Sequence, residues 1–519
     1  MSSSLPSTRQ RQRQRQRRPV CTFMTFAMTI LWFRTSFGFY SFPQTQRWTF
    51  RRFRPHSGFL LPAEEASPGI RSTISSHSSS SSTSSFITTT TTTTKTTTNT
   101  TTPQILIHWK GEFEKNYSVP FRQLEFLNAL AAVLQVTETP KLDFINALDC
   151  HPDLLFGQEQ VQLYNEAMQY IIYNETQIPR QAMYKATQRC SLVHAMYQIV
   201  AMGKDHEELT NKALLDSGDS FADLQQQNGN TTSWCVRARN YGPDTLGRHS
   251  HKARSMSLEQ KILVTLTPLL STFTGPVNLS HPDAKIYVFD GLLGDSPTVL
   301  ARRAAVGPIT SSISPRTRIC ITNTPLPPMA AYTMCNLARI QNGQTILDPY
   351  AGSCTILLAA AMMAPHCRTV GIEIAHDVNA SAMVADFVTR GLTPPTAFLR
   401  GDCTLTTMRH NARAAIGGNA FDVICTDPPY GVRESLGQDV NPLDQLFSSI
   451  QEDRSQGSRL VKVGGRVVAF VPVTTEETLE ECLPSQQQTQ LAGLELEVVQ
   501  EQVLNDRLSR WLVAFRCIR

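Results

Sequence analysis

The chain has 519 residues, of which 41% are hydrophobic and 18% charged, so it is long enough for two or three domains with ordinary apolar cores. Its formal net charge is +5, but the first 103 residues carry 13 Lys or Arg against Glu64 and Glu65, a local charge of +11 that leaves −6 on the remainder. The body is therefore not a generally basic nucleic-acid binder, and any RNA contact must come from a local patch. The 12 cysteines include no C-x-x-C pair, so neither a zinc site nor a disulfide framework is predicted, and no metal site is expected.

Residues 1–103 are predicted to be a disordered targeting leader. An Arg-Gln repeat precedes an apolar run at 20–33 and a Ser/Thr-rich run at 72–102, a composition that cannot bury a core. The apolar run is too short to span a bilayer but suits a signal peptide, so no stable membrane anchor is expected. The segment as a whole resembles the bipartite leader of algae with secondary plastids, which favours a plastid or other organelle. The alternative is a cytoplasmic enzyme with an unprocessed extension.

A globular pattern begins at Gln104. Residues 105–109 are predicted to form a strand, and residues 121–136 a helix with apolar positions at three- and four-residue spacing. A second helix is expected around residues 192–202, and the polar segment 205–230 is expected to be a loop or domain junction.

Cations gather in residues 226–312. A strand at 234–239 places Arg237 and Arg239 on one face, because side chains alternate along a strand. A basic segment follows, ahead of a helix at 257–270 that starts with the capping-box pattern Ser-Leu-Glu-Gln, and a strand at 285–289 comes next. A solvated surface without a partner is the alternative to RNA binding here. The candidate RNA contacts in this region are Arg237, Arg239, Arg248, Lys252 and Arg254.

A strand-loop-helix unit opens the last region, residues 313–519. The strand 344–347 runs into Asp348-Pro349-Tyr350-Ala351-Gly352-Ser353-Cys354, and a helix at 355–363 follows. Gly352 lacks Cβ, so a ligand can approach the backbone closely, and the helix start offers unpaired N–H groups. The loop resembles the S-adenosylmethionine motif D-P-x-x-G-[ST]-G of amino-methyltransferases, with Cys354 where that motif has Gly. The resemblance implies cofactor contacts from Asp348, Tyr350, Gly352 and Ser353.

Two further acids follow the next strands. Glu373 ends the strand 369–372 and is placed to accept hydrogen bonds from ribose hydroxyls, while Asp402 follows the strand 397–400, where the same family places an acid near adenine. A helix cap for Glu373 and a plain turn for Asp402 are the structural alternatives. The chain has no G-x-G-x-x-G after a strand and no P-loop, which disfavours a dinucleotide- or nucleotide-phosphate-binding domain.

The apolar strand 421–426 leads into Asp427-Pro428-Pro429-Tyr430. Two consecutive prolines fix φ and remove two N–H donors, so the loop is stiff and presents acceptors. An exocyclic amine needs such acceptors: the Asp427 carboxylate and the Pro428 carbonyl can take its hydrogens, while the Tyr430 ring offers a flat face to a base. A Pro-rich turn of no catalytic importance is the alternative. A central strand at 465–471 and an antiparallel pair, 494–503 with 510–515, are predicted to complete the sheet.

The continuation of this motif, Thr426 to Glu434 with Arg433, resembles the eukaryotic and archaeal tRNA (guanine-10-N2)-methyltransferases. That resemblance implies an α/β chain in which a Rossmann-like class I methyltransferase domain, 313–519, follows a smaller α+β region for RNA binding. The α+β region comprises a ferredoxin-like part, 104–225, and a THUMP-like part, 226–312. The resemblance also implies S-adenosyl-L-methionine as cofactor, tRNA as substrate and a small zinc-containing activator subunit as a partner. It adds Asn323 and Thr324 to the cofactor site, and Arg433 as an RNA-phosphate contact or an anchor for Glu434.

Other substrates and one other class of protein remain open. The D-P-P-Y loop also serves enzymes that methylate rRNA guanine-N2 or DNA adenine-N6, whereas protein glutamine methylation is disfavoured because that group prefers Asn at the Asp427 position. A noncatalytic RNA-binding subunit is the alternative from a different class.

Overall fold

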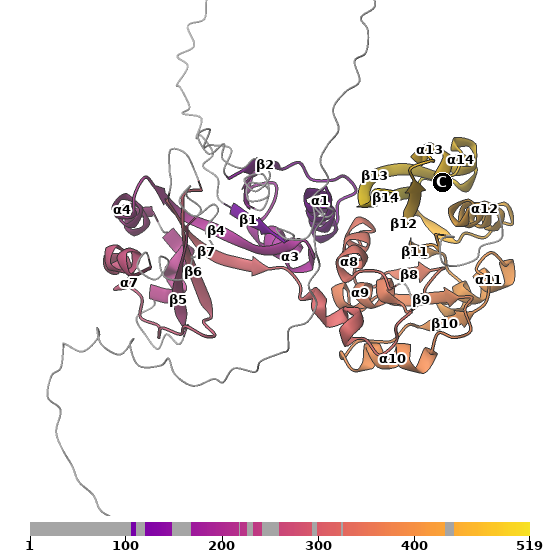
Figure 1. The fold of residues 1–519 in the computed structure, drawn as a ribbon, viewed down its shortest axis with the longest axis horizontal. Helices are drawn as coiled ribbons and strands as arrows, with labels where there is room; N and C mark the ends of the chain where they lie inside the picture. The colour runs from indigo at the N-terminus through magenta and orange to yellow at the C-terminus, as the bar shows by residue number, and fades with distance from the viewer. Residues whose placement is uncertain are drawn as a thin grey trace, which may run out of the picture. The chain divides into compact units, whose positions relative to one another are not determined.

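The computed structural model describes residues 105–110, 120–147, 168–216, 218–225, 232–240, 259–292, 298–322, 325–430 and 441–519. All of these belong to one compact unit, Lys95–Arg519. They form two sheets (Figure 1), each of seven strands within the described residues. The predicted leader, residues 1–103, lies outside the described part of the chain.

The first sheet has the strand order β2-β3-β1-β4-β7-β6-β5. Its pairs are antiparallel except for β5 with β6. The sheet continues without interruption past residues 225 and 226 through the long pair β4–β7, so the two expected parts of this region share one sheet. The strands are β1 (Ile105–Trp109), β2 (Asp143–Asn146), β3 (Met168–Ile172), β4 (Val193–Gly203), β5 (Trp234–Asn240), β6 (Ala284–Asp290) and β7 (Thr298–Val306).

Helices pack against the half of this sheet around β1 and β3 and against the half around β5 and β6. α1 (Phe121–Leu134) and α3 (Arg180–Arg189) bury Phe126 and Met183 against β1 and β3. α4 (His206–Asp216), the short α5 (Ala222–Gln225) and α7 (Thr267–Leu270) surround a second cluster with β5 and β6. The predictions of strands at 105–109, 234–239 and 285–289 and of a helix from residue 121 are confirmed. The capping-box residues Ser257 and Leu258 lie outside the described residues, and the described part of that helix begins at Glu259.

Two predictions in this region are wrong. The segment predicted as a helix at 192–202 is β4, because its backbone pairs with β1 on one side and β7 on the other. The β-branched Val193, Ile199 and Val200 favour this state, while the intervening Ala and Met residues suit either. The polar segment 205–230 is not a plain loop, since it contains α4, α5 and the 3₁₀ turn η1 (Gly218–Phe221); Leu209 and Ala213 supply the buried face of α4.

The second sheet has the order β10-β9-β8-β11-β12-β14-β13. β8 to β12 run parallel, and β14 pairs antiparallel with both β12 and β13. This is the strand order of a Rossmann-like class I methyltransferase domain, so the predicted α/β fold and the terminal antiparallel pair are confirmed. The strands are β8 (Thr345–Asp348), β9 (Arg368–Glu373), β10 (Ala397–Arg400), β11 (Phe421–Thr426), β12 (Val461–Thr474), β13 (Leu494–Asn505) and β14 (Leu508–Cys517).

Helices cover both faces of this sheet (Figure 1). Adjacent strand residues point to opposite faces, so Ile346 packs with α8, α9 and α10 while Leu347 packs with α11 and α12. The carboxyl ends of β8, β9, β10 and β11 therefore meet at one edge, which we call the carboxyl edge. The helices are α8 (Pro328–Leu337), α9 (Thr355–Met363), α10 (Ala380–Val388), α11 (Thr406–Ala415), α12 (Pro442–Ser455), α13 (Leu479–Cys482) and α14 (Gln486–Ala492).

A buried polar network joins α1 and α3 to α8. The Asn336 side-chain amide donates to Glu125 Oε1 at 3.0 Å and to the Arg189 carbonyl at 2.9 Å, and its oxygen accepts from Arg189 Nε at 2.9 Å. Glu125 also accepts backbone N–H bonds from Ser191 and Leu192. Burial raises the pKa of Glu125 and lowers that of Arg189, so both groups depend on these partners to remain charged.

Asn336→Ala is expected to lower the free energy of unfolding by about 2–4 kcal/mol, because it removes one hydrogen-bond partner from each of the buried, charged Glu125 and Arg189. Urea denaturation measures the change. The control is Asn211→Ala at an exposed position of α4, where the change should stay within about 0.5 kcal/mol. Equal effects of the two substitutions would show that the network contributes nothing specific.

Candidate active site

The loop between β8 and α9 is tied to the end of β9. The Gly352 N–H donates to Glu373 Oε2 at 2.6 Å, and Glu373 Oε1 accepts from the Ala375 N–H at 2.7 Å. Gly352 has φ +49°, and a Cβ built there would meet nothing within 4 Å, so open space borders the loop. The structure thus brings together Gly352 and Glu373, which the sequence assigned to one cofactor site.

Cys354, the departure from the motif, caps α9 with φ +62° and is fully buried. This left-handed conformation costs a non-glycine residue roughly 1–2 kcal/mol. The loop therefore keeps the backbone course that a glycine would adopt without strain.

Asp348 links the ends of β8 and β11. Its Oδ1 accepts from the Thr426 hydroxyl at 2.7 Å and from the Tyr350 N–H at 3.2 Å, and the side chain is buried. Burial, with a smaller contribution from the negative charges of Asp427 and Glu373, raises the pKa of Asp348 to about 7, while its hydrogen bonds from Thr426 and Tyr350 oppose the rise. Acids from three strand ends thus lie within electrostatic reach of one another.

The D-P-P-Y loop continues directly from Thr426. The Tyr430 hydroxyl donates to Asp427 Oδ1 at 2.6 Å, and Pro428 is buried. Burial, followed by the charge of Asp427, raises the pKa of Tyr430, which keeps the hydroxyl protonated. The loop residues 428–430 therefore fold back over Asp427.

Arg510 of β14 interacts with Tyr430 of this loop. Its guanidinium carbon lies 4.1 Å from the centroid of the Phe470 ring, and Nε donates to Gln502 Oε1 at 2.6 Å. Arg510 is buried, and its charge opposes the rise in the pKa of Tyr430. No pattern in the sequence indicates this role, because Arg510 reads only as part of the last strand.

Asp402 and Tyr350 lie near each other at the ends of β10 and β8. Asp402 Oδ1 accepts from the Thr404 N–H at 2.8 Å and from its hydroxyl at 2.7 Å, the geometry of an Asx turn. The Tyr350 hydroxyl donates to the Pro442 carbonyl at 3.1 Å. Burial raises the pKa of Tyr350, as do Cys403 and the negative charge of Asp402. Asp402 thus has the turn role that was its structural alternative, at a position that also borders the predicted site.

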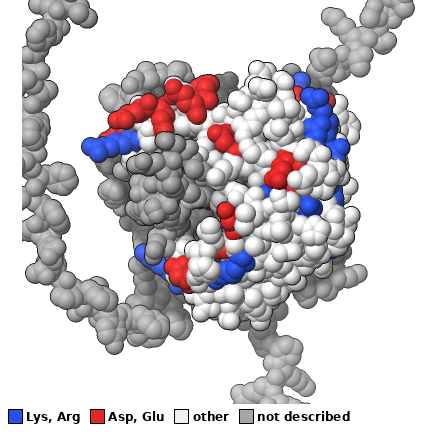
Figure 2. Space-filling view, turned by 90° about the vertical axis from the view of Figure 1, so that its right-hand side faces the viewer, with Lys and Arg blue, Asp and Glu red and all other residues white. Residues whose placement is uncertain are grey.

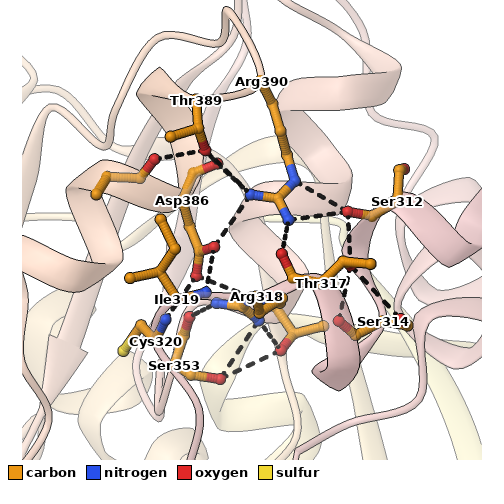
Figure 3. Close-up of polar contacts among 12 residues, drawn as sticks. Ser312, Ser314, Thr317, Arg318, Ile319, Cys320, Ser353, Asp386, Thr389 and Arg390 are labelled. Carbon is orange, nitrogen blue, oxygen red and sulfur yellow. Dashed lines mark hydrogen bonds and ion pairs between the residues drawn. The ribbon is translucent and has the colours of Figure 1, made fainter.

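Arg318, in the segment that precedes α8, forms a buried ion pair with Asp386 of α10 and hydrogen bonds with the loop between β8 and α9 (Figure 3). Arg318 Nε lies 3.1 Å from Asp386 Oδ2, Nη1 donates to the Thr355 hydroxyl at 2.6 Å, and Nη2 donates to the Ser353 carbonyl. Asp386 also accepts the N–H groups of Ile319 and Cys320. Against the opposing effect of burial, these N–H donors and Arg318 lower the pKa of Asp386. Ser353 therefore has a structural partner in addition to its predicted cofactor role.

The predicted RNA contacts are only partly described. Arg239 is exposed on β5, and Arg237 donates to the Leu279 carbonyl at 2.8 Å. On the face drawn in Figure 2, which is the right-hand side of Figure 1 and therefore the side of the second sheet, Lys and Arg form separate small groups with acids between them. Six predicted site residues lie outside the described part of the chain: Arg248, Lys252, Arg254, Asn323, Thr324 and Arg433.

The fold and these loops define a class I methyltransferase domain. Residues 315–492, which include Asp348 and Asp427, match the family described as RMKL-like, methyltransferase domain. Among the described residues, no helix combines the length and apolar character that crossing a bilayer requires.

The curated enzymes to which the chain is similar include the following three. It is 25% identical to the U6 snRNA (guanine-N(2))-methyltransferase THUMPD2 of Bos taurus over 219 residues, 42% of this chain and 38% of the relative. It is 24% identical to the tRNA (guanine(10)-N(2))-methyltransferase TRMT11 of Xenopus laevis over 305 residues, 51% of this chain and 62% of the relative. Identity is 32% to the tRNA (guanine(10)-N2)-dimethyltransferase of Pyrococcus abyssi over 134 residues, 24% of this chain and 34% of the relative. The chain thus spans less than two thirds of the length of each of these relatives.

Among solved structures, TrmN from Thermus thermophilus aligns with a TM-score of 0.35 and 20% identity, covering 73% of this chain and 99% of that one.

Asp348→Asn is expected to flatten the pH dependence of stability. With a pKa of about 7 in the folded protein and about 3.9 unfolded, the native state binds more protons, so Asp348 makes the free energy of unfolding fall as pH rises across this window. The neutral variant lacks this decrease in the free energy of unfolding, which amounts to at most roughly 4 kcal/mol. Urea denaturation at pH 5 and pH 8 measures it, with Asp377→Asn at an exposed position as the control. Identical slopes for wild type and Asp348→Asn would contradict the assignment.

Proposed function

We propose that this protein transfers a methyl group from S-adenosylmethionine to the exocyclic N2 amine of a guanosine in tRNA, at position 10. The observation that carries the proposal is the Asp348–Thr426 hydrogen bond of 2.7 Å. It sets the start of the D-P-P-Y loop beside the loop of Gly352 and Glu373, so that an amine acceptor and a candidate cofactor pocket share the carboxyl edge.

The residues at this edge fit the cofactor. The open space beside Gly352 leaves room for a ligand against the backbone. Glu373 suits the ribose hydroxyls, because a carboxylate can accept several hydrogen bonds and its two described bonds come from backbone N–H groups. Asp348, Tyr350, Ser353 and Asp402 would form the rest of the pocket. When bound, S-adenosylmethionine supplies a methyl group activated by a positively charged sulfur.

The chain's own contribution is to orient the amine. Asp427 and the Pro428 carbonyl accept its two hydrogens, which directs the nitrogen lone pair toward the methyl group. Asp427 can also receive the proton that the methylated nitrogen releases. The Tyr430 ring stacks on the base, while its hydroxyl stays bonded to Asp427 and holds the carboxylate in place. Positioning of this kind accounts for about 7–11 kcal/mol of barrier lowering in well-oriented reactions.

The choice of guanine and of tRNA rests on the relatives. All three are named for methylation of guanine N2. The tRNA enzyme of Xenopus laevis is covered over 62% of its length, against 38% for the U6 snRNA enzyme of Bos taurus, which supports tRNA over U6 snRNA. Family resemblance also supports a small zinc-containing activator subunit as a partner.

Asp427→Ala is expected to lower kcat by about 10²–10³-fold, because it removes an acceptor that is aimed at the reacting amine. Asp427→Asn keeps one acceptor oxygen and should retain part of the activity. The assay follows methyl incorporation into unmodified tRNA, U6 snRNA and rRNA fragments, and into a tRNA with guanosine 10 replaced. Calorimetry checks that S-adenosylmethionine still binds.

The matched control is Asp143→Ala at an exposed position of β2, which should leave turnover unchanged. Full activity of Asp427→Ala would refute the catalytic assignment. Methylation of U6 snRNA or rRNA alone would move the substrate assignment to that RNA. Absence of cofactor binding by the wild-type chain would favour a noncatalytic RNA-binding subunit.

We also propose that residues 1–103 direct the protein to a plastid or another organelle. The composition of the segment supports this, with 13 basic and two acidic residues and a Ser/Thr-rich run. A fluorescent protein fused behind these residues should enter the organelle in an alga with secondary plastids. The same fusion with residues 20–33 deleted is the control. A cytoplasmic signal from the intact fusion would exclude the targeting role.

A further inference from the structure

A polar hollow lies at the edge of the second sheet opposite the carboxyl edge. Its volume is about 380 Å³. It is lined by residues at the amino ends of β8, β11 and β12, at the carboxyl end of the antiparallel β14, and just beyond α1 and α8. It includes none of the predicted cofactor or D-P-P-Y residues, so it is a separate feature of the domain.

The hollow has more cations than carboxylates. Arg339, Lys462, Arg466 and Arg516 line it, with Asp422 as the acid among its lining residues. Lys462 Nζ pairs with Asp422 Oδ1 at 2.6 Å. One further carboxylate, Glu497, serves two guanidinium groups: Arg466 Nη1 lies 2.6 Å and Arg516 Nη1 3.7 Å from its oxygens. Two arginines therefore share one negative charge.

Arg339 adds a third guanidinium, whose described hydrogen bonds go to neutral oxygens. Nε donates to Asn128 Oδ1 at 3.0 Å, and Nη1 donates to the carbonyls of Val136 and Thr137 at 3.0 and 2.6 Å. Burial, together with the positive charges of Arg466 and Arg516, lowers the pKa of Arg339 to about 10, while the negative charge of Glu497 opposes this change. The field inside the hollow is thus positive, and an entering anion would relieve it.

Two glycines shape the rim of the hollow. Gly464 has φ +82°, and a Cβ there would meet nothing within 4 Å, so space is open beside it. A Cβ on Gly465 would come within 2.6 Å of the Asp422 carbonyl oxygen, so β12 approaches β11 closely at this point. The pairing register of β11 with β12 shifts between Phe421 and Val423, which marks an irregularity next to these glycines. Arg339 itself has φ +53°, a backbone conformation that favours glycine. A long cationic side chain therefore occupies a position where the backbone conformation favours a residue without a side chain.

We infer that this hollow binds a phosphate group. Guanidinium groups match phosphate oxygens through paired N–H donors, and the more exposed Arg516 and Lys462 can reach a ligand that the buried Arg339 and Arg466 attract. The phosphate has two possible sources. If it is a backbone phosphodiester of the RNA, the inference rests on the proposed function. If it is a free phosphate, the inference is independent of that function.

The test uses the full chain and four variants: Lys462→Ala, Arg516→Ala, their combination, and Arg516→Lys. The matched control is Arg368→Ala, an exposed cation at the amino end of β9 that does not line the hollow. Isothermal titration with inorganic phosphate measures the free ligand. Filter binding of tRNA over a range of salt concentrations measures the RNA. Thermal unfolding and S-adenosylmethionine binding confirm that each variant is folded.

A phosphodiester site predicts weaker tRNA binding by the alanine variants, with the salt slope reduced by about 1 for each phosphate that is no longer neutralised, and recovery in Arg516→Lys. A free-phosphate site predicts that phosphate binding weakens in the same variants while tRNA binding stays unchanged. Either result supports the inference, and the second does so even if the protein methylates no RNA. The inference is overturned if folded alanine variants match Arg368→Ala in both assays.

Discussion

The hydrogen bond between Thr426 and the buried Asp348 is the contact on which the candidate site depends. It crosses from β11 to β8, the neighbouring strands at the centre of the parallel sheet, and fixes where both loops leave that sheet. Burial and the surrounding acids make Asp348 a carboxyl that is easily protonated near neutral pH. A hydroxyl donor is therefore an effective partner, since it can serve the ionised carboxylate and can also accept from the protonated acid.

The two edges of the second sheet have opposite electrostatic character. The carboxyl edge, where open α/β sheets bind their ligands, contains the acids Asp348, Glu373, Asp402 and Asp427. The opposite edge of the sheet contains three arginines and a lysine around the hollow, next to the point where the pairing register of β11 with β12 shifts. A sulfonium cofactor and a phosphate would thus be attracted to different ends of one domain.

The sequence predicted the parallel part of the second sheet well, because β8, β9 and β11 are short apolar runs that end in recognisable loops. It also named Asp348, Gly352, Glu373 and Asp427, which the structure brings together. It failed at 192–202, where Ala, Met and Tyr are compatible with either helix or strand and tertiary pairing decides between them. Thr426, Arg318 and Arg510 were missed as site residues because their roles come from partners distant in sequence, which no local pattern reveals.

The pairing of β4 with β7 has a consequence for biosynthesis. Because β4 is synthesised well before β7, it emerges from the ribosome while one of its two neighbouring strands is still untranslated. The backbone groups on that edge of β4 therefore stay unpaired until β7 has been made. Separating the region between residues 225 and 226 would leave these two strands on different fragments. The first sheet therefore matures as one cooperative body only after the chain has passed Val306, just ahead of the methyltransferase domain.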